Sequence, residues 1–309
     1  MNMKNRIVAV VVTFNRKELL YECLTALTAQ SVPNDILIID NGSTDHTKEH
    51  ISSFLEYENV CYCNAERNLG GAGGFNLGMK KAAERGYEYI WIMDDDTIPE
   101  QNALEELLKA DCLLKGTYGF LASAVLWIDG TACLMNVPGV SKNYLEGDNN
   151  RYLEKGLLSI RHASFVSAFF PGKIVREAGL PIKEFFIWND DYEYTTRISR
   201  KYNCYYVPRS RVIHKMKKNI KTNIVLDTPD RVGRYRYSYR NSYYTARKEG
   251  AVEIIKYYFN VLTACFNIIR SNCPAKIKRL KTVLQGVFAG WFFRPKVELV
   301  SKNNKDMEL

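Results

Sequence analysis

Three consecutive aspartates, Asp94, Asp95 and Asp96, follow the short apolar run that begins at Tyr89. Adjacent carboxylates repel one another, so a run of three is costly to place unless positive charge neutralises it. Carboxylate oxygens at this spacing can bind Mg²⁺ or Mn²⁺ and leave coordination positions open for substrate phosphates. The run therefore predicts a divalent cation that bridges to a diphosphate. The alternative is a set of ordinary turn and cap residues ahead of Pro99.

A second acidic pair, Asp190 and Asp191, lies in the stretch FFIWNDDYEYTTR, near the predicted start of a helix. A carboxylate held within hydrogen-bond reach of a hydroxyl can take its proton while a new bond forms, which is general base catalysis. In the alternative, Asn189 or Asp190 is an N-cap and Trp188 is a core residue. The two interpretations are compatible, because a cap position also holds a carboxylate rigidly.

Alternating strand and helix patterns must position these carboxylates. Strands are predicted over residues 7–13, 35–40, 60–63 and 87–93, and helices after Asn15, from Ser43–Asp45 to about Leu55, from about Phe75 to Arg85 and from about Gln101. Asn15 and Glu18 form a predicted capping box, and NLGGAGG at 68–74 is predicted to be a flexible loop.

This alternation predicts an α/β fold with a mostly parallel sheet and right-handed crossovers. Ligands of such sheets bind outside the carboxyl ends of the strands. Asp40 and the Asp94–Asp96 run both follow predicted strands. We therefore expect them to converge on one crevice.

Composition restricts the class of protein. A chain of 309 residues with 46% hydrophobic content can bury one large domain, or a domain with an appendage. The eight cysteines show no CxxC pair or disulfide spacing, which suggests a reducing compartment. The apolar run from Ile7 is followed at once by Asn15, Arg16 and Lys17, which indicates a first strand and not a signal peptide.

The net charge of +9 is divided unevenly along the chain. Residues 1–200 carry 20 basic and 27 acidic side chains, a balance of −7, whereas residues 201–309 carry 23 and 7, a balance of +16. A basic C-terminal third suits phosphate groups, an anionic membrane surface or nucleic acid. A solvated basic face is the alternative.

Four motifs in order resemble one family. VVVTFNR, DNGSTD (40–45), NLGGAGGFNLG (68–78) and WIMDDD together resemble the family 2 inverting glycosyltransferases with the GT-A fold, in the branch that contains bacterial galactofuranosyltransferases. The resemblance covers roughly the first two thirds of the chain. It implies a GT-A catalytic domain over 1–225, with a Rossmann-like, mostly parallel sheet flanked by helices. A basic, aromatic-rich helical region over 226–309 would follow.

The resemblance also implies roles at the donor side. Thr13 and Asp40 would hold the uridine, Asp94 would contact the nucleotide, and Asp95 would touch the donor sugar. Asp96 and His214 would bind Mn²⁺ or Mg²⁺. The remaining donor-binding residues would be Asn68, Gly70, Gly71, Gly73 and Gly74, whose glycines permit close backbone approach to the donor.

At the acceptor side, the resemblance implies that Asp191 is the base and that Asp190 orients the acceptor. Trp188 would offer an apolar face to a sugar ring, and Arg240 and Asn241 would lie on the acceptor or diphosphate side. A single base implies that the product has inverted anomeric configuration. For Arg240 and Asn241, the alternative is a helix packed on the catalytic domain with its arginines solvated.

The last part of the chain reads as two helices, Val252 to about Arg270 and Ala275 to about Trp291. They are rich in aliphatic and aromatic residues, and no uninterrupted apolar run reaches the ~18 residues that span a bilayer. The helices could lie on a membrane surface, dimerise or cover the sheet. Peripheral membrane contact and a homo-oligomer therefore both stay open.

Together these features predict a cytoplasmic enzyme, peripheral on the inner face of the plasma membrane, that needs Mn²⁺ or Mg²⁺. It would move galactofuranose from UDP-galactofuranose to a hydroxyl of a cell-surface glycan or a lipid-diphosphate-linked O-antigen or capsule intermediate. A rhamnosyltransferase using dTDP-rhamnose is the alternative within the class. A non-catalytic basic adaptor for membrane or nucleic acid is the alternative outside it, although no nucleic-acid-binding module accompanies the basic residues. A nucleotidyltransferase should have a glycine-containing loop near its start, which VTFNRKE lacks.

Overall fold

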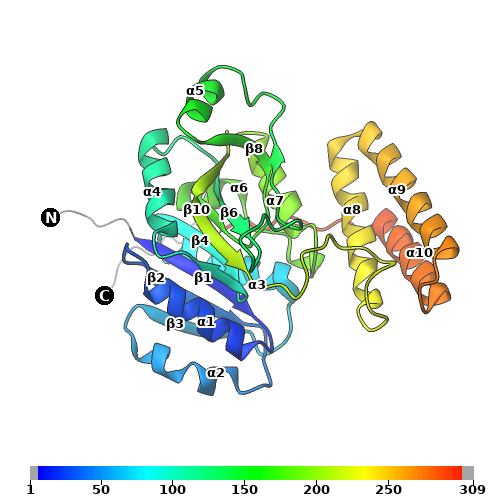
Figure 1. Cartoon of the computed structure of the whole chain (residues 1–309), viewed down its shortest axis with the longest axis horizontal. Helices are drawn as coiled ribbons and strands as arrows, with labels where there is room; N and C mark the ends of the chain where they lie inside the picture. The colour runs from blue at the N-terminus through cyan, green and yellow to red at the C-terminus, as the bar shows by residue number, and fades with distance from the viewer. Residues whose placement is uncertain (1–5, 301–309) are drawn as a thin grey trace.

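The computed structural model describes residues 6–300. The first part of the chain alternates strands and helices around a parallel sheet (Figure 1). Its elements are β1 (Ile7–Thr13), α1 (Lys17–Thr28), β2 (Asp35–Asp40), α2 (Thr47–His50), the short 3₁₀ helix Ser52–Glu56, β3 (Val60–Asn64), α3 (Gly70–Glu84) and β4 (Tyr89–Asp94). All seven residues of β1 are buried, as expected for a strand with helices on both faces.

The second part of the chain makes the sheet mixed. It adds β5 (Thr97–Pro99), α4 (Ala103–Leu114), β6 (Leu121–Leu126), β7 (Gly139–Val140), α5 (Asp148–Glu154), β8 (Leu158–His162), β9 (Ala168–Pro171), α6 (Gly172–Ala178), the 3₁₀ helix Lys183–Phe185, α7 (Asp190–Ser199) and β10 (Tyr205–His214). Within the described residues the order is β3-β2-β1-β4-β9-β6-β10-β8-β7, with β5 paired to β10. Strands β3, β2, β1 and β4 are parallel, β9 runs antiparallel to both β4 and β6, and β10 pairs with β6 in parallel.

Two apolar layers hold the helices to the sheet. Alternate residues of β1 point to opposite faces: Val11 belongs to the layer that contains α1 and α4, and Val10 to the layer that contains α3, α6 and α7. Trp91, fully buried in β4, donates from its indole nitrogen to Ser167 at 2.9 Å. Helices therefore pack on both faces of the sheet and hold its strand ends in place.

Three local predictions are wrong. Asn15 does not cap α1, because its side-chain oxygen accepts from the backbone nitrogen of Thr44 at 2.7 Å. The helix expected up to Leu55 is one turn of α helix followed by a 3₁₀ turn. The glycine-rich segment is not a loop, because α3 begins at Gly70 and includes the later glycines. The parallel strands and the remaining helices are confirmed.

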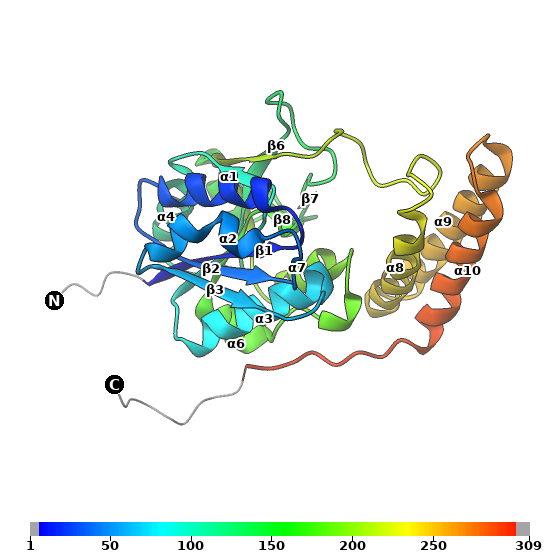
Figure 2. The same ribbon diagram turned by 90° about the horizontal axis from the view of Figure 1, so that it is seen from below.

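The C-terminal helices form a separate layer beside the sheet (Figures 1 and 2). They are α8 (Tyr235–Glu249), preceded by the 3₁₀ turn Val232–Arg234, α9 (Ala251–Arg270) and α10 (Lys276–Phe292), and they share an apolar cluster of their own. The chain then returns to the layer that contains the sheet, where Glu298 forms ion pairs with Lys80 at 2.8 Å and with Lys183 at 2.9 Å. The helical prediction is confirmed, and this return segment ties the helices back to the sheet.

Among the described residues, α9 is the one helix long and apolar enough to cross a membrane, judged by length and composition only. Its mean hydropathy is 1.2, and 17% of the scored window is buried inside the protein. The sequence was predicted to contain no membrane-spanning stretch because no uninterrupted apolar run is long enough. Helix α9 is nevertheless apolar on average, because most of its polar residues are uncharged.

Candidate active site

The strand register brings the predicted acidic residues to one edge of the sheet. Thr13 of β1 lies beside Asp40 of β2, and Val12 of β1 lies beside Asp94 of β4. These residues end their strands, so the carboxyl ends of β1, β2 and β4 meet at the same place. The predicted convergence is confirmed.

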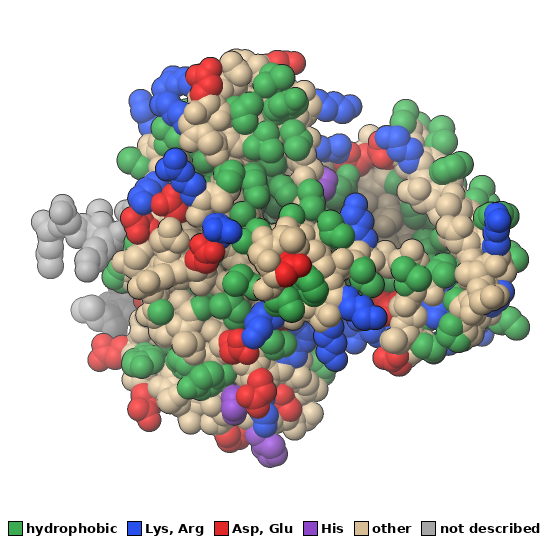
Figure 3. Space-filling view, in the orientation of Figure 1, with side chains coloured by type: hydrophobic (Ala, Val, Ile, Leu, Met, Phe, Trp, Pro, Cys, Tyr) green, Lys and Arg blue, Asp and Glu red, His purple; other side chains and the backbone are tan. Residues whose placement is uncertain are grey.

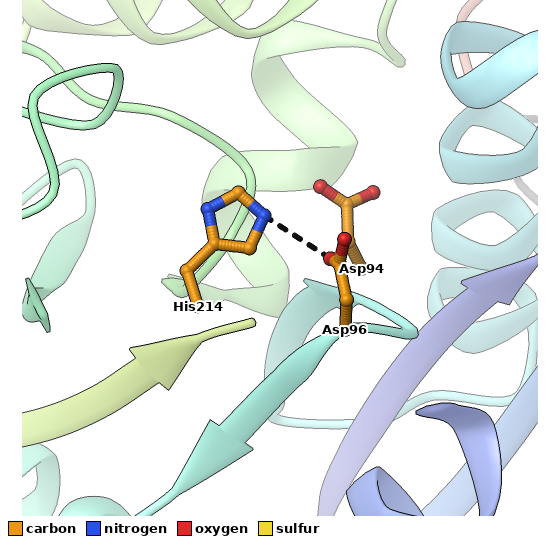
Figure 4. A group of neighbouring side chains, drawn as sticks. All are labelled: Asp94, Asp96 and His214. Carbon is orange, nitrogen blue, oxygen red and sulfur yellow. Dashed lines mark ion pairs between the residues drawn. The ribbon is translucent and has the colours of Figure 1, made fainter. Parts of the chain in front are cut away.

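Asp94, Asp96 and His214 form a compact cluster at this edge (Figure 4). One potential ligand atom from each lies within 4.8 Å of the others. The antiparallel pairing of β5 with β10 sets His214 opposite Thr97, directly after Asp96. His214 Nε2 lies 3.1 Å from Asp96 Oδ1, although more than a hundred residues separate the two.

The electrostatics of the cluster favour a bound cation. Burial and the neighbouring Asp96 raise the pKa of Asp94 to about 7. Burial disfavours the charge of Asp96, but His214 and Arg16 together outweigh burial and lower the pKa of Asp96. Two carboxylates and an imidazole are an acceptable donor set for Mn²⁺ or Mg²⁺, with the nitrogen favouring Mn²⁺. The side chains therefore fit the predicted cation, with Asp94 joining Asp96 and His214.

His214 has a partner on its other nitrogen. Nδ1 lies 2.9 Å from Asn136 Oδ1 and 3.8 Å from the Cys133 sulfur. Burial opposes protonation of the ring, but the hydrogen bonds to Asp96 and Cys133 raise the pKa of His214 to about 10. An Nδ1–H donated to Asn136 orients Nε2 toward the carboxylates, the usual arrangement behind a histidine ligand. The sequence pattern did not indicate Asn136.

Arg16 supplies positive charge that offsets the repulsion among the three consecutive aspartates. Its guanidinium lies 2.7 Å from Asp96 Oδ2 and 3.2 Å from Asp95 Oδ1. Burial would lower the pKa of Arg16, but the three aspartates raise it. Sequence reasoning missed this residue. The signal was available, since Arg16 follows the carboxyl end of β1, the strand next to the one that carries the acids.

Two residues that were predicted to contact the donor, Thr13 and Asp95, form a hydrogen bond with each other inside the protein. The Thr13 hydroxyl donates to Asp95 Oδ2 at 2.7 Å, and Asp95 is 3% exposed. Burial raises the pKa of Asp95 to about 6, although Arg16 lowers it. In this structure Asp95 fixes Thr13 and Arg16, and its contact with the donor sugar stays a prediction.

Asp40 is also held from both sides. Its Oδ1 accepts from the Ser43 backbone nitrogen at 2.8 Å, and its Oδ2 accepts from the Tyr62 hydroxyl. Burial and the hydrogen bond to Asp40 raise the pKa of Tyr62 well above its ordinary value. Asp40 remains at the strand end where a uridine is predicted, in a fixed orientation.

The glycines of α3 serve packing more than donor approach. A Cβ on Gly70, where φ is +70°, would lie 2.0 Å from the Phe186 carbonyl oxygen, and one on Gly74 would lie 2.5 Å from Val12. A Cβ on Gly73 would meet Leu69 at 2.6 Å. Gly71 is different, because nothing lies within 4 Å of its Cβ position. Of the four glycines, only Gly71 faces open space of the kind that donor approach requires.

Asn68 precedes this helix and is exposed. Its side-chain oxygen accepts from the Gly70 backbone nitrogen at 2.8 Å, which satisfies one of the free donors at the helix start. Asn68 therefore positions the helix end in this structure.

The acidic pair Asp190 and Asp191 opens α7, as predicted. Burial and the neighbouring Asp191 raise the pKa of Asp190 well above its ordinary value, and Asp94 contributes in the same direction. Burial raises the pKa of Asp191 to about 6, while the Tyr192 backbone nitrogen donates to its Oδ1 at 2.7 Å. Burial thus raises the pKa of both members of the pair, and the repulsion from Asp191 adds to the shift of Asp190.

The backbone before this pair is strained. Phe186, Trp188 and Asn189 have φ of 66°, 65° and 62°, values that residues with side chains rarely adopt. Such strain clusters at functional sites and persists where surrounding contacts enforce it. Here α8 supplies the contacts: Asn189 Nδ2 donates to Ser242 at 3.1 Å.

Arg240 and Asn241 hold the backbone of this segment. Asn241, 0% exposed, donates to the carbonyls of Phe185, Ile187 and Trp188 at 3.0, 3.1 and 2.9 Å. Arg240 donates to the carbonyls of Glu184 and Phe185 at 2.5 and 3.2 Å. In this structure both side chains position this segment, and their contact with the acceptor or the diphosphate stays a prediction.

Trp188 packs against α8. Its ring lies 4.9 Å from that of Tyr235, between centroids, and the side chain is half-buried against the C-terminal cluster. The alternative interpretation of Trp188 as a packing residue therefore describes part of its role.

Residues 8–112 match the family model described as Glycosyl transferase family 2. Galactofuranosyltransferase GlfT1 of Mycolicibacterium smegmatis is 40% identical over 92 residues, 29% of this chain and 30% of the relative. The protein of that name from Mycobacterium tuberculosis is 30% identical over 206 residues, 64% of this chain and 66% of the relative. The chain thus aligns with less than two thirds of either relative.

The fold has counterparts among solved structures. GalNAc-T7, solved with UDP, GalNAc and Mn²⁺, superposes with a TM-score of 0.58 at 15% sequence identity, covering 89% of this chain and 59% of that one. Identity this low supports the fold alone. Residues 8–112, which include the strands β1, β2 and β4 of the site, thus match glycosyltransferase family 2, and the chain has the GT-A fold.

Proposed function

We propose that this protein transfers a sugar from a nucleotide-diphosphate donor to a hydroxyl, with a divalent cation and with inversion at the anomeric carbon. The observation that carries the proposal is the cluster of Asp94, Asp96 and His214 at the strand ends, with ligand atoms within 4.8 Å. The influence of Asp94 on the pKa of Asp190 indicates that the acidic pair lies close to this cluster. A cation site and a base are the two parts that inverting transfer requires.

Asp94, Asp96 and His214 would hold Mn²⁺ or Mg²⁺. When bound, the cation supplies positive charge that stabilises the leaving diphosphate. Arg16 adds fixed positive charge at the same edge, through its contacts with Asp95 and Asp96. Asp40 and Thr13 are proposed to border the nucleoside, and Asn68 and Gly71 to border the donor at the start of α3.

Asp191 is proposed as the base. With a pKa of about 6 it is ionised at neutral pH and can accept the proton of the acceptor hydroxyl. The hydroxyl oxygen then bonds to the anomeric carbon while the bond to the diphosphate breaks on the opposite face. Asp190, whose pKa is raised by burial and by Asp191, is proposed to donate a hydrogen bond to the acceptor.

For the donor we propose UDP-galactofuranose. Support comes from the relatives named galactofuranosyltransferase, at 40% identity over 92 residues and 30% over 206. As acceptor we propose a bacterial cell-surface or lipid-diphosphate-linked glycan at the cytoplasmic face, with residues 1–225 as the catalytic domain.

Nucleotide binding tests this proposal. Calorimetry of UDP, dTDP and GDP with the purified chain, each with Mn²⁺ and with EDTA, should show selective binding of UDP that requires Mn²⁺. Transfer from UDP-galactofuranose would then be measured directly. A preference for dTDP would replace galactofuranose by rhamnose. Absence of cation-dependent binding to all three nucleotides would contradict the proposal.

A further inference from the structure

Helix α9 presents a continuous apolar stripe to solvent. Its members recur every three or four residues along one face and are each 58–69% exposed: Val252, Ile255, Phe259, Leu262, Phe266 and Ile269. The opposite face of α9 is packed against α8 and α10, since Tyr257, Val261 and Ile268 are buried in the C-terminal cluster. The exposed stripe therefore takes no part in the packing of the three helices against one another.

Helix α10 adds a second apolar surface. Its exposed members are Ile277, Leu284, Phe288, Trp291 and Phe292. A shallow groove of about 500 Å³ runs along this helix, lined by Ile277, Leu280, Lys281, Leu284, Gln285 and Phe288. Hydrophobic side chains with interspersed cations gather over the C-terminal helices in Figure 3. Exposed apolar surface of this extent on one unit marks an interaction site.

Positive charge borders the apolar surface. Residues 251–292 contain six basic side chains, of which all but the buried Arg279 are at least partly exposed, and one acidic side chain, Glu253. A second groove, of about 550 Å³, lies next to the first and shares Lys281 and Gln285 with it. Its lining includes Arg234, Arg236 and Lys278, with Asp230 as the acidic member. Apolar side chains beside exposed cations match the boundary of an anionic bilayer, where chains meet headgroups.

We infer that the α9–α10 surface, defined by these exposed apolar residues and the adjoining basic groove, docks onto an anionic lipid bilayer. A second copy of the chain would bring the same excess of positive charge against itself, which opposes self-association through this face. The stripe of α9 enters the interface, and the basic groove receives lipid phosphates. Helix α9 lies on the bilayer and does not cross it, because Tyr257 and Val261 hold it to α8 and α10.

Docking there would orient the acidic pair. Helix α8 packs against α10, where Gly286 lies against the Arg236 backbone, and α8 carries Asn241. Asn241 holds the segment that leads into Asp190. The surface and the site thus share one helix as their connection, and the docking itself does not depend on the identity of the donor.

Vesicle flotation of the full chain tests the inference. Vesicles of phosphatidylcholine alone are compared with vesicles that also contain phosphatidylglycerol. Phe259→Ser with Phe288→Ser removes apolar surface, and Arg270→Glu with Lys281→Glu reverses charge; all four side chains are exposed, so folding should persist. The matched controls on the catalytic layer are Tyr57→Ser with Leu145→Ser and Lys155→Glu with Lys201→Glu. Circular dichroism in the absence of vesicles verifies that each variant is folded.

We expect the wild-type chain to float with anionic vesicles and only weakly with neutral ones, and added salt to reduce flotation. Each α9–α10 double variant should lower the partition coefficient by about tenfold or more, while the controls keep it. Equal flotation with neutral and anionic vesicles would overturn the inference, as would equal loss in the controls. So would a concentration-dependent dimer that the phenylalanine variant abolishes without any vesicle binding by the wild type.

Discussion

The side-chain amide of Asn241 donates to the backbone carbonyl of Trp188 at 2.9 Å, and in doing so connects α8 to the strained segment before the acidic pair. The same amide also reaches the carbonyls of Phe185 and Ile187. A helix outside the sheet therefore fixes the backbone from which Asp191 projects. This relationship explains why Asn241 is completely buried although it lies on the helical layer.

Replacing Asn241 by Ala should reduce turnover more than donor binding. The substitution leaves buried carbonyls without a donor, which costs about 1–3 kcal/mol of stability, and it frees the segment that positions Asp191. We expect kcat to fall at least tenfold, because a small displacement of Asp191 from the acceptor hydroxyl slows the reaction. The affinity for UDP and Mn²⁺ should not change. The exposed Asn260→Ala provides the control. A lower Tm with normal kcat in the folded protein would show that Asn241 is structural only.

Replacing Arg16 by Ala should impair the donor site. Without the guanidinium, Asp95 and Asp96 lose their nearest positive charge, so both carboxylates become harder to ionise. We expect transfer to fall roughly tenfold or more, since charge aimed at a developing diphosphate contributes at this scale. Steady-state kinetics would measure it, with the exposed Arg85→Ala as control. Unchanged kinetics would mean that the cation alone neutralises the run.

The rate of transfer should depend on a group with a pKa of about 6. Burial raises the pKa of Asp191, so its carboxylate is present above that pH and protonated below it. A base must be deprotonated to act, and kcat/KM should therefore fall about tenfold per pH unit below 6 and level off above it. Circular dichroism across the range would exclude acid unfolding. A flat profile from pH 5 to 7 would contradict the assignment.

Cation binding should release a proton from His214. Without a cation, the ring is protonated at neutral pH, since its bonds to Asp96 and Cys133 raise its pKa to about 10 despite burial. A metal ligand must be neutral, so Mn²⁺ affinity should rise with pH up to that value. Calorimetry in buffers of different ionisation enthalpy would count the protons, to which Asp94 also contributes because its pKa is raised to about 7. His214→Asn should lower the number released and weaken binding, whereas the exposed His46→Asn should do neither.

The parallel strands, the strand ends and the helix that begins at Asp190 could be predicted because they follow local patterns: buried β-branched runs and acidic residues at element boundaries. The family resemblance added the roles. The glycine-rich segment was misjudged for a physical reason. Glycine disfavours helix in isolation, but Gly74 and Gly78 lie against Val12 and Val10, and this tertiary packing outweighs propensity.

The positioning residues could not be predicted, because their partners are distant in the sequence. Asn136 reaches His214 across 78 residues, and Asn241 reaches Trp188 across 53. Asn136 lies in no recognisable motif. Arg240 and Asn241 lie in a segment that resembles the same glycosyltransferase branch, and the resemblance implied an acceptor-side or diphosphate-side role for them. Their use as backbone clamps depends on the close approach of α8 to the strained segment, which no local pattern encodes.

The most direct test of the account is the transfer rate of Asp191→Asn with UDP-galactofuranose, measured beside its UDP and Mn²⁺ affinity. Asparagine keeps the shape of the side chain but cannot accept the acceptor proton. We predict that transfer is nearly abolished, that UDP and Mn²⁺ bind as in the wild type, and that Asp190→Asn is affected less. Wild-type transfer by Asp191→Asn would contradict the central claim that this carboxylate is the base.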